Sequence, residues 1–229
     1  MKTKRKAIKK ATQTKRKAVD TKQAKFWKGK FSKGYVDRNL LSVEGLNERM
    51  RSYFSESEPY SKMIQASLKG VPKNASILEV GCNVGNILTV LQSLGYKNLR
   101  GIELNPDVVK AANTLRPALN IKAGNILDIL AADGAYDLVY TAGVLIHIAP
   151  ENIDQALSEI IRVSKKYIWG YEYWSSTYEE IPYRGNRNVL WKTDFAARYR
   201  KLAKLSLVYF RKLPLKEKPK CDVIYLLKK

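Results

Sequence analysis

The sequence predicts an α/β fold with a doubly wound, mostly parallel seven-stranded sheet that ends in an antiparallel hairpin. Two observations predict this fold. From residue 76 onward, short apolar runs alternate with amphipathic stretches of helical period, a pattern typical of βα units around a parallel sheet. The last two apolar runs are joined by a Pro- and Lys-rich loop without a helix, which indicates a hairpin.

Each element is assigned from the period of its apolar residues. The predicted strands are 77–80, 99–103, 118–122, 136–141, 167–171, 205–211 and 222–227. The predicted helices between them are 85–94, 106–116, 151–163 and 192–202. One further helix is expected over residues 43–68, with Pro72 ending it.

Composition divides the chain into three parts. Residues 1–25 contain Thr-Lys-Arg-Lys-Ala twice and few large apolar side chains, so they are expected to form a basic, disordered arm. Aromatic residues cluster just after residue 25, and residues 26–75 are therefore expected to form an N-terminal helical cap segment. Residues 76–229 are expected to form the sheet domain. At 229 residues, no second large domain is required.

The net charge of +21 is concentrated at both ends of the sequence. Residues 1–30 hold 13 Lys and Arg against one acid, and residues 183–229 hold 14 against three. The middle of the chain is close to neutral, with 15 basic residues against 17 acids. Basic ends of this kind attract phosphate-bearing partners, so nucleic acid is one candidate partner for the Lys-rich arm.

Hydropathy and cysteine content favour a cytoplasmic protein. No apolar run approaches the roughly 20 residues that span a bilayer, and the basic N-terminus lacks the apolar segment of a secretory signal. Cys82 and Cys221 fit neither a disulfide framework nor a zinc site, and no cluster of acids suggests a metal. The oligomeric state stays open.

The most informative stretch is residues 76–88, where an apolar strand runs into a glycine turn and then a helix. Gly81 and Gly85 let the backbone pass close to a ligand, and Asn83 is the next best residue for a positive φ. A dinucleotide loop has glycine at the first, third and sixth positions of the turn, a spacing that this chain does not match. An S-adenosylmethionine loop has an acid two residues before the first glycine, and Glu79 stands there. The spacing therefore favours S-adenosylmethionine as the cofactor.

Two further positions are consistent with adenosine binding. Glu103 ends the second predicted strand, where an acid can accept hydrogen bonds from both ribose hydroxyls. NAD enzymes place an acid there too, so Glu103 does not choose between the cofactors. After the third strand, the side-chain carbonyl of Asn125 and the N–H of Ile126 could read the adenine edge. An ordinary turn is an equal alternative for Asn125.

These motifs resemble those of class I methyltransferases, whose fold is Rossmann-like. The resemblance lies in Glu-Val-Gly-Cys-Asn-Val-Gly from residue 79, Gly-Ile-Glu-Leu-Asn-Pro from residue 101, Gly-Asn-Ile-Leu-Asp from residue 124 and Tyr-Asp-Leu-Val-Tyr from residue 136. It implies S-adenosylmethionine as cofactor and methyl transfer as the reaction. The cofactor contacts that we expect are Tyr35, Arg38, Glu79, Gly81, Asn83, Gly85, Glu103, Leu104, Asn125 and Ile126.

A narrower resemblance covers residues 26–212. Phe-Trp-Lys-Gly-Lys-Phe from residue 26 and Glu-Ile-Pro-Tyr-Arg-Gly from residue 180 look like blocks of the methylases associated with pseudaminic acid biosynthesis. Two features depart from that pattern. Asn83 stands where glycine is commoner, and the Lys-rich arm lies outside the family's sequence. The resemblance therefore implies the cofactor and the reaction type and leaves the acceptor open.

The candidate catalytic and acceptor residues follow the fourth and fifth strands. His147, the one histidine of the chain, could remove a proton from the acceptor or pack at the strand end. At the end of the fifth strand, Glu172 and Tyr173 are candidate catalytic residues and Tyr171 a candidate substrate contact. Because strand side chains alternate, Glu172 cannot face the same way as the two tyrosines while the strand continues.

The loop after the fifth strand supplies the remaining candidates. Tyr183 and Arg184 are candidate acceptor contacts, with a solvated loop as the alternative. No Asn/Asp-Pro-Pro-Tyr sequence follows the fourth strand, which argues against a DNA adenine methyltransferase. The leading hypothesis is methylation of a polar, sugar-like small molecule. The alternatives are an RNA-directed methyltransferase that uses the basic ends and a basic binding protein without catalysis.

Overall fold

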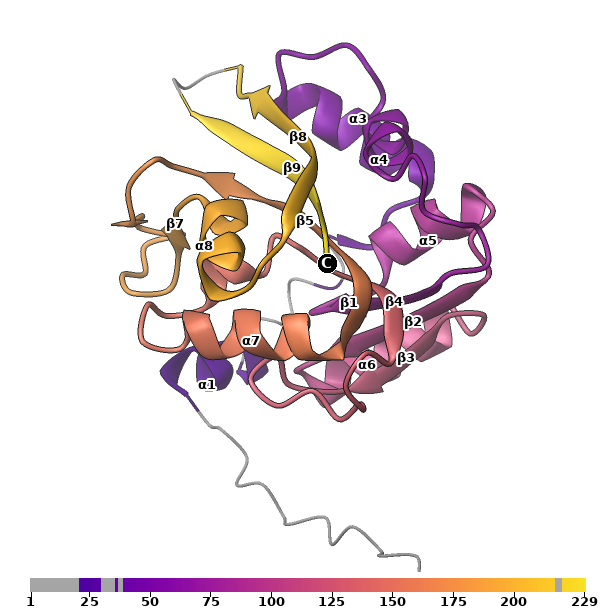
Figure 1. The fold of residues 1–229 in the computed structure, drawn as a ribbon, viewed down its shortest axis with the longest axis horizontal. Coiled ribbons are helices and arrows are strands. Elements are labelled where there is room, and N and C mark those ends of the chain that lie inside the picture. Colours follow the sequence, from indigo (N-terminus) through magenta and orange to yellow (C-terminus); the bar gives the residue numbers. More distant parts are fainter. Residues whose placement is uncertain (1–20, 30–35, 37–38, 217–219) are drawn as a thin grey trace, which may run out of the picture.

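A computed structural model of the chain describes residues 21–29, 36, 39–216 and 220–229. Seven strands form one sheet in the order β3-β2-β1-β4-β5-β9-β8 (Figure 1). They are β1 (Ser76–Val80), β2 (Asn98–Glu103), β3 (Asn120–Ala123), β4 (Tyr136–Ala142), β5 (Ser164–Trp174), β8 (Ser206–Pro214) and β9 (Cys221–Lys228). The doubly wound sheet that the sequence predicts is confirmed, and each predicted strand overlaps an observed one.

The direction of the strands also agrees with the prediction. Strands β1 to β5 pair in parallel, with Ile77 of β1 opposite Leu99 of β2 and Leu138 of β4. Strand β9 lies between β5 and β8 and is antiparallel to both. The carboxyl ends of β1, β2, β3 and β4 therefore meet at one edge, where open α/β sheets bind ligands.

Helices cover both faces of the sheet (Figure 1). One face packs against α3 (Val43–Tyr53), α4 (Tyr60–Ser67), α5 (Asn86–Ser93) and α6 (Pro106–Leu115). The other face packs against α7 (Ile153–Val163) and α8 (Phe195–Leu202). Helix α7 shows why: Ile153, Leu157 and Ile160 lie at helical spacing and are fully buried against the sheet. Within the described residues, no helix has the length and apolar character needed to span a membrane.

The single helix predicted over residues 43–68 is wrong. The segment forms α3 and α4, because the backbone at Phe54 and Ser55 pairs instead with the end of β8, where the Ser55 N–H donates to the Pro214 carbonyl at 2.9 Å. Pro59 then precedes α4, at a position where its missing N–H costs little. Helix α4 ends at Ser67, before Gly70, and not at Pro72.

The predicted disordered arm is too long by at least four residues. Helix α1 spans Lys22–Lys28, and the Thr21 side chain caps it by accepting from the Ala24 N–H at 3.0 Å. Ala24 is buried. The boundary predicted at residue 25 therefore falls inside a packed helix. Tyr35 and Arg38, two predicted cofactor contacts, lie outside the described residues.

The loop after β5 contains elements that the sequence did not predict. Strands β6 (Glu179–Glu180) and β7 (Trp191–Lys192) form a two-stranded sheet. The helix predicted from residue 192 begins at Phe195, because Lys192 belongs to β7 and Asp194 caps α8 through a 2.8 Å bond from the Ala197 N–H. This small sheet holds the segment 181–190 against the carboxyl edge of the main sheet.

Candidate active site

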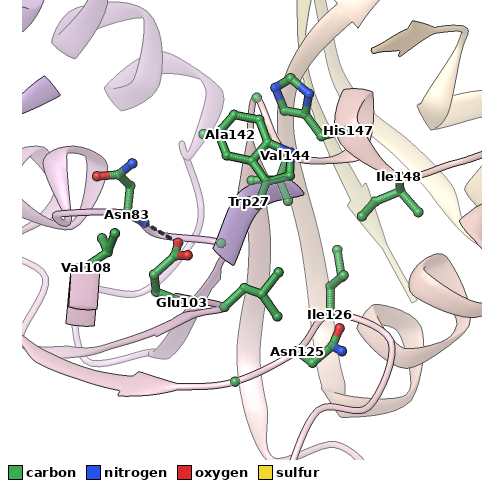
Figure 2. Close-up of a pocket in the computed structure, with 14 residues that line it drawn as sticks. Trp27, Asn83, Glu103, Val108, Asn125, Ile126, Ala142, Val144, His147 and Ile148 are labelled. Carbon is green, nitrogen blue, oxygen red and sulfur yellow. Dashed lines mark hydrogen bonds between the residues drawn. The ribbon is translucent and has the colours of Figure 1, made fainter. Parts of the chain in front are cut away.

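A cavity of about 820 Å³, counted out to its mouth, opens at the carboxyl edge of the sheet (Figure 2). The lining residues come from the loops after β1 to β4 and from α1: Trp27, Gly81, Asn83, Glu103, Leu104, Val108, Gly124, Asn125, Ile126, Ala142, Gly143, Val144, His147 and Ile148. Six of the ten predicted cofactor contacts are among them.

The loop after β1 turns sharply along the cavity wall. Gly81 and Asn83 have positive φ values of 75° and 48°. A Cβ atom at Gly81 would come within 2.7 Å of a Val144 methyl group, so only glycine lets the two loops touch here. Gly85 also has a positive φ, but it is buried outside the cavity lining, and a Cβ there would meet Leu119 at 2.7 Å. The prediction that Gly85 contacts the cofactor is therefore not supported by its position, which serves packing under the loop.

Glu79 does not line the cavity, so its predicted role as a direct cofactor contact stays a prediction. The side chain is buried, and Oε2 accepts a 2.9 Å hydrogen bond from the Tyr140 hydroxyl. Burial raises the pKa of Glu79 to about 8, although the bond from Tyr140 acts in the opposite direction. At neutral pH, the carboxyl group is therefore mostly protonated beneath the glycine turn.

Glu103 lies at the end of β2 with its carboxylate on the cavity wall (Figure 2). Oε2 accepts from the Asn83 N–H and Oε1 from the Asn105 N–H, both at 3.0 Å. Burial raises the pKa of Glu103, and these hydrogen bonds lower it. Because a carboxylate offers about four acceptor positions, capacity remains for a hydroxyl group of a ligand beside the N–H groups of Asn83, Asn105 and Leu104.

The loop after β3 closes the same wall. Asn125 and Ile126 line the cavity, and so does Leu104 from the loop after β2. The side-chain Oδ1 of Asn125 accepts a 2.9 Å bond from the Leu127 N–H, which is an Asx turn. The predicted turn role of Asn125 is thus present, and its position on the wall keeps the adenine role open.

His147 ends the short 3₁₀ helix η1 (Leu145–His147) and lines the cavity. Its Nδ1 lies 2.9 Å from the Val189 carbonyl oxygen. Because a carbonyl can only accept, Nδ1 carries the proton and Nε2 the lone pair. Burial lowers the pKa of His147 to about 4, so the ring is neutral at physiological pH. Its neighbours are the rings of Trp27 and Tyr183, with centroids 4.5 and 5.3 Å away.

Glu172, predicted as a catalytic residue, is fully buried and does not line the cavity. Oε1 accepts the N–H groups of Val144 and Leu145 at 3.2 Å, and Oε2 lies 3.4 Å from the Ile146 nitrogen. Burial raises the pKa of Glu172 to about 7. The carboxylate therefore fixes the loop that carries His147, and its contact with the acceptor stays a prediction that this buried position does not support.

The other predicted acceptor residues divide between core and surface. The Tyr171 hydroxyl donates to Asp222 Oδ2 at 2.5 Å, and its ring packs against Tyr60 at 5.3 Å, away from the cavity. Tyr173 packs against the core on the α7 side and is also absent from the lining. Tyr183 is half-buried beside His147.

Arg184 does not line the cavity. It is exposed, has a φ of 47°, and begins the two-residue turn Arg184-Gly185 between Tyr183 and Asn186. Its guanidinium lies 5.9 Å from the Tyr183 ring centroid. Among the described residues, no group of three or more His, Cys, Asp and Glu could hold a metal ion.

Trp27 is the one Trp, Tyr or Phe among the described lining residues, and the sequence analysis gave it no role. It belongs to α1, and Figure 2 shows its indole between Glu103 on one side and His147 on the other. The signal was present as an aromatic cluster just after the Lys-rich arm. Nothing local in sequence indicated that this cluster would reach the edge of a sheet that begins about 50 residues later.

Residues 78–167 match the family described as a methyltransferase domain. The matched segment runs from β1 into β5. It contains the glycine turn, Glu103, Asn125 and the loop that carries His147.

Solved structures show the same fold. The 1,6-didemethyltoxoflavin-N1-methyltransferase of Burkholderia thailandensis, solved with 1,6-didemethyltoxoflavin and S-adenosylhomocysteine, is similar over 87% of this chain and 88% of its own, at 15% identity and a TM-score of 0.60. A methyltransferase of Methanosarcina mazei is similar over 73% of this chain and 96% of its own, at 16% identity and a TM-score of 0.59. A Pyrococcus horikoshii protein is similar over 78% and 95%, at 15% identity and a TM-score of 0.57.

The domain match, the sheet order and a cavity at the carboxyl edge agree with one another. Residues 78–167 therefore form a methyltransferase domain, and the chain has the fold of S-adenosylmethionine-dependent methyltransferases.

Proposed function

We propose that this enzyme methylates a polar, sugar-like small molecule, with the cofactor held along the wall formed by the loops after β1, β2 and β3. The observation that carries the cofactor part is Glu103, whose carboxylate faces the cavity with acceptor capacity left for a ribose hydroxyl. Gly81 and Asn83 then lie beneath the methionine part, and Asn125 and Ile126 beside adenine.

The cofactor supplies a methyl group already activated on a sulfonium sulfur. The protein's contribution is to align the acceptor and to exclude water. His147 is placed to accept a hydrogen bond or a proton at Nε2, because Nδ1 is committed to the Val189 carbonyl. With a pKa near 4, the ring is a weak base and orients a hydroxyl or amine more effectively than it ionises one.

The acceptor is proposed to lie between His147 and the segment 181–190. Tyr183 offers an aromatic face half-buried beside His147, a surface that packs well against the C–H face of a sugar ring. The resemblance of residues 180–185 to methylases associated with pseudaminic acid biosynthesis supports a sugar-like acceptor. Glu172 supports the site from behind by fixing the loop 144–146.

Calorimetric titration tests the cofactor assignment first. S-adenosylmethionine and S-adenosylhomocysteine should both bind at one site, and NADH should not. If the protein bound NADH more tightly than S-adenosylmethionine, the fold assignment would stand and the proposed function would be wrong. A screen of polar metabolites with a radiolabelled methyl donor then identifies the acceptor. We expect the label to appear in sugar fractions that contain no nucleotide.

RNA methylation is a second candidate, favoured by the exposed Arg184 and Arg187 beside Tyr183 and by the 14 basic residues of the segment 183–229. We propose that the basic arm predicted over residues 1–25 has no part in cofactor binding; its residues 1–20 lie outside the described residues. Deleting them should leave S-adenosylmethionine affinity unchanged. RNA affinity that is strongly salt-dependent, and that survives this deletion, would favour the second candidate and place the RNA on the C-terminal third.

A further inference from the structure

Trp27 has a position in the cavity that the binding residues assigned above do not explain. Its indole is half-buried and lies 4.5 Å from the His147 ring, centroid to centroid, at an interplanar angle of 62°. Figure 2 shows it between Glu103 and His147. Glu103 belongs to the proposed ribose wall, and His147 belongs to the proposed acceptor wall.

The chemistry of the cofactor defines what must pass between those walls. Its sulfur is joined to the ribose through one carbon and carries the methyl group that faces the acceptor. A ligand whose ribose is held by Glu103 and whose acceptor lies beside His147 therefore places its sulfur between them. In S-adenosylmethionine this sulfur bears a positive charge, and the face of an indole is the strongest side-chain aromatic partner for a cation.

We propose that Trp27 binds the sulfonium end of the cofactor, and that Asn105 is a positioning residue that holds Trp27 there through α1. This inference rests on the proposed cofactor site. The aromatic candidates at the end of the fifth strand, Tyr171 and Tyr173, do not line the cavity. Trp27 is the one Trp, Tyr or Phe side chain among the described lining residues.

Hydrogen bonds hold helix α1 at the cavity at both of its ends. Near its start, Gln23 Nε2 donates to the Asn188 carbonyl at 3.3 Å. At its end, Asn105 Nδ2 donates to the carbonyls of Trp27 and Lys28 at 3.2 and 3.4 Å. The last carbonyls of a helix have no partner within the helix, so this amide acts as a cap supplied by another element. A helix of seven residues is marginal by itself and depends on such contacts.

Asn105 joins α1 to the cofactor wall. It is 3% exposed, and its backbone N–H donates to Glu103 Oε1 at 3.0 Å. Its side-chain Oδ1 caps α6 by accepting from the Asp107 N–H at 2.9 Å. Asn105 therefore fixes the positions of the Glu103 carboxylate, the start of α6 and the backbone of Trp27 relative to one another.

The test compares two ligands that differ in charge at sulfur: S-adenosylmethionine carries the cation and S-adenosylhomocysteine does not. We expect Trp27→Leu, which keeps an apolar side chain without a ring, to reduce affinity for S-adenosylmethionine about 2- to 30-fold more than affinity for S-adenosylhomocysteine. Trp27→Phe should give a smaller change in the same ratio. Calorimetry provides the affinities, and thermal melts show that each variant is folded.

Asn105→Asp tests the positioning role, because aspartate keeps the α6 cap and loses the amide donor to α1. We expect about tenfold faster tryptic cleavage after Lys28, followed by mass spectrometry, and a lowered ratio of the two affinities. Asn113→Asp is the matched control: its amide donates to the Ile121 carbonyl at 3.0 Å from the same helix, away from α1. This control should change neither readout.

The outcomes separate the two proposals. If the wild-type protein bound neither ligand, the proposed function itself would be wrong. Wild-type binding of both ligands, with an unchanged affinity ratio in Trp27→Leu, would overturn the sulfonium contact alone. An equal loss of both ligands would make Trp27 a plain apolar wall and would also overturn it. Cleavage after Lys28 at the wild-type rate in Asn105→Asp would overturn the positioning role.

Discussion

The two walls of the cavity are built in different ways. The cofactor wall comes from loops that follow β1, β2 and β3, and each loop continues directly from a strand whose register is fixed by its neighbours. The acceptor wall joins α1, η1 and the segment 181–190, which lie far apart in the sequence. The first wall inherits its geometry from the sheet, whereas the second depends on long-range contacts through single residues such as Glu172 and Asn105.

Substitutions in the glycine turn test this difference between the two walls with the largest expected effect. Gly81→Ala and Gly85→Ala each add a Cβ in left-handed backbone, 2.7 Å from Val144 and Leu119 respectively. Conformational strain and overpacking should together cost each variant about 2–5 kcal/mol of unfolding free energy. Only Gly81→Ala should also weaken S-adenosylmethionine binding in the folded protein. Urea melts measure the unfolding free energy, and calorimetry measures the affinity for S-adenosylmethionine. A stable Gly85→Ala variant that does not bind S-adenosylmethionine would show that Gly85 contacts the cofactor.

Glu172→Ala should damage the acceptor wall through folding and not through chemistry. It leaves the N–H groups of Val144, Leu145 and Ile146 without their acceptor. An unsatisfied buried donor costs about 1–3 kcal/mol, so we expect a loss of about 3 kcal/mol or more in unfolding free energy. Equilibrium urea unfolding measures it. Full stability combined with lost methyl transfer would instead support the catalytic role predicted from the sequence.

Glu103→Ala should act on the cofactor wall with a smaller effect. We expect S-adenosylmethionine binding to weaken by about 1.5–3 kcal/mol, the range for hydrogen bonds to a charged group. The loss should be equal for S-adenosylhomocysteine, because the ribose is common to both ligands. Calorimetric titration of both ligands checks this, and Glu103→Gln, which keeps one oxygen, is the matched variant. A loss confined to one ligand would contradict the ribose assignment.

Glu79 lies under the cofactor wall and should make stability depend on pH. Its folded pKa of about 8 lies above the ordinary value of 4.5, so the folded state binds the proton more tightly. The stabilising effect is full below about pH 4.5 and is lost as pH rises toward 8. Thermal melts from pH 5 to 8 should show a decline that Glu79→Gln reduces. Parallel pH curves for both proteins would contradict the buried neutral carboxyl.

His147 should give the smallest signal, which is no titration at all near pH 6.5. Burial holds its pKa at about 4, and it is the one histidine in the sequence, so untagged protein gives a single imidazole Hε1 resonance. The chemical shift of this resonance, followed by NMR, should stay constant from pH 8 to 5.5. A midpoint near 6.5 would show an accessible ring and strengthen its candidacy as a general base.

The sequence indicated the turns that line the cavity because their signals are local. The positive φ values at Gly81 and Asn83, the acid at Glu103 and the turn at Asn125 each follow from a few neighbouring residues. The strands were recognisable for the same reason, since apolar period and turn residues are properties of short windows. Gly85 shows the limit: the same conformational signal marks a glycine that is needed for packing against Leu119.

The acceptor wall was predicted poorly because burial cannot be inferred from residue type. Glu172 and Tyr171 stand at the end of a strand, where polar side chains commonly face a ligand. Both instead satisfy partners inside the protein, the N–H groups of η1 and the carboxylate of Asp222. The break between α3 and α4 has a similar origin, because it depends on pairing of Phe54 with Leu215, about 160 residues away.

Strand β9 has a consequence for the order of synthesis. It is the last strand along the described chain, yet it occupies a place inside the sheet between β5 and β8. Until residues 221–228 leave the ribosome, the 11-residue β5 has an unpaired edge, and β8 has no neighbour to join. Open edges of this kind invite pairing with other nascent chains. Translation therefore delivers β9 after both of its neighbours in the sheet, and the growing polypeptide exposes these open edges until then.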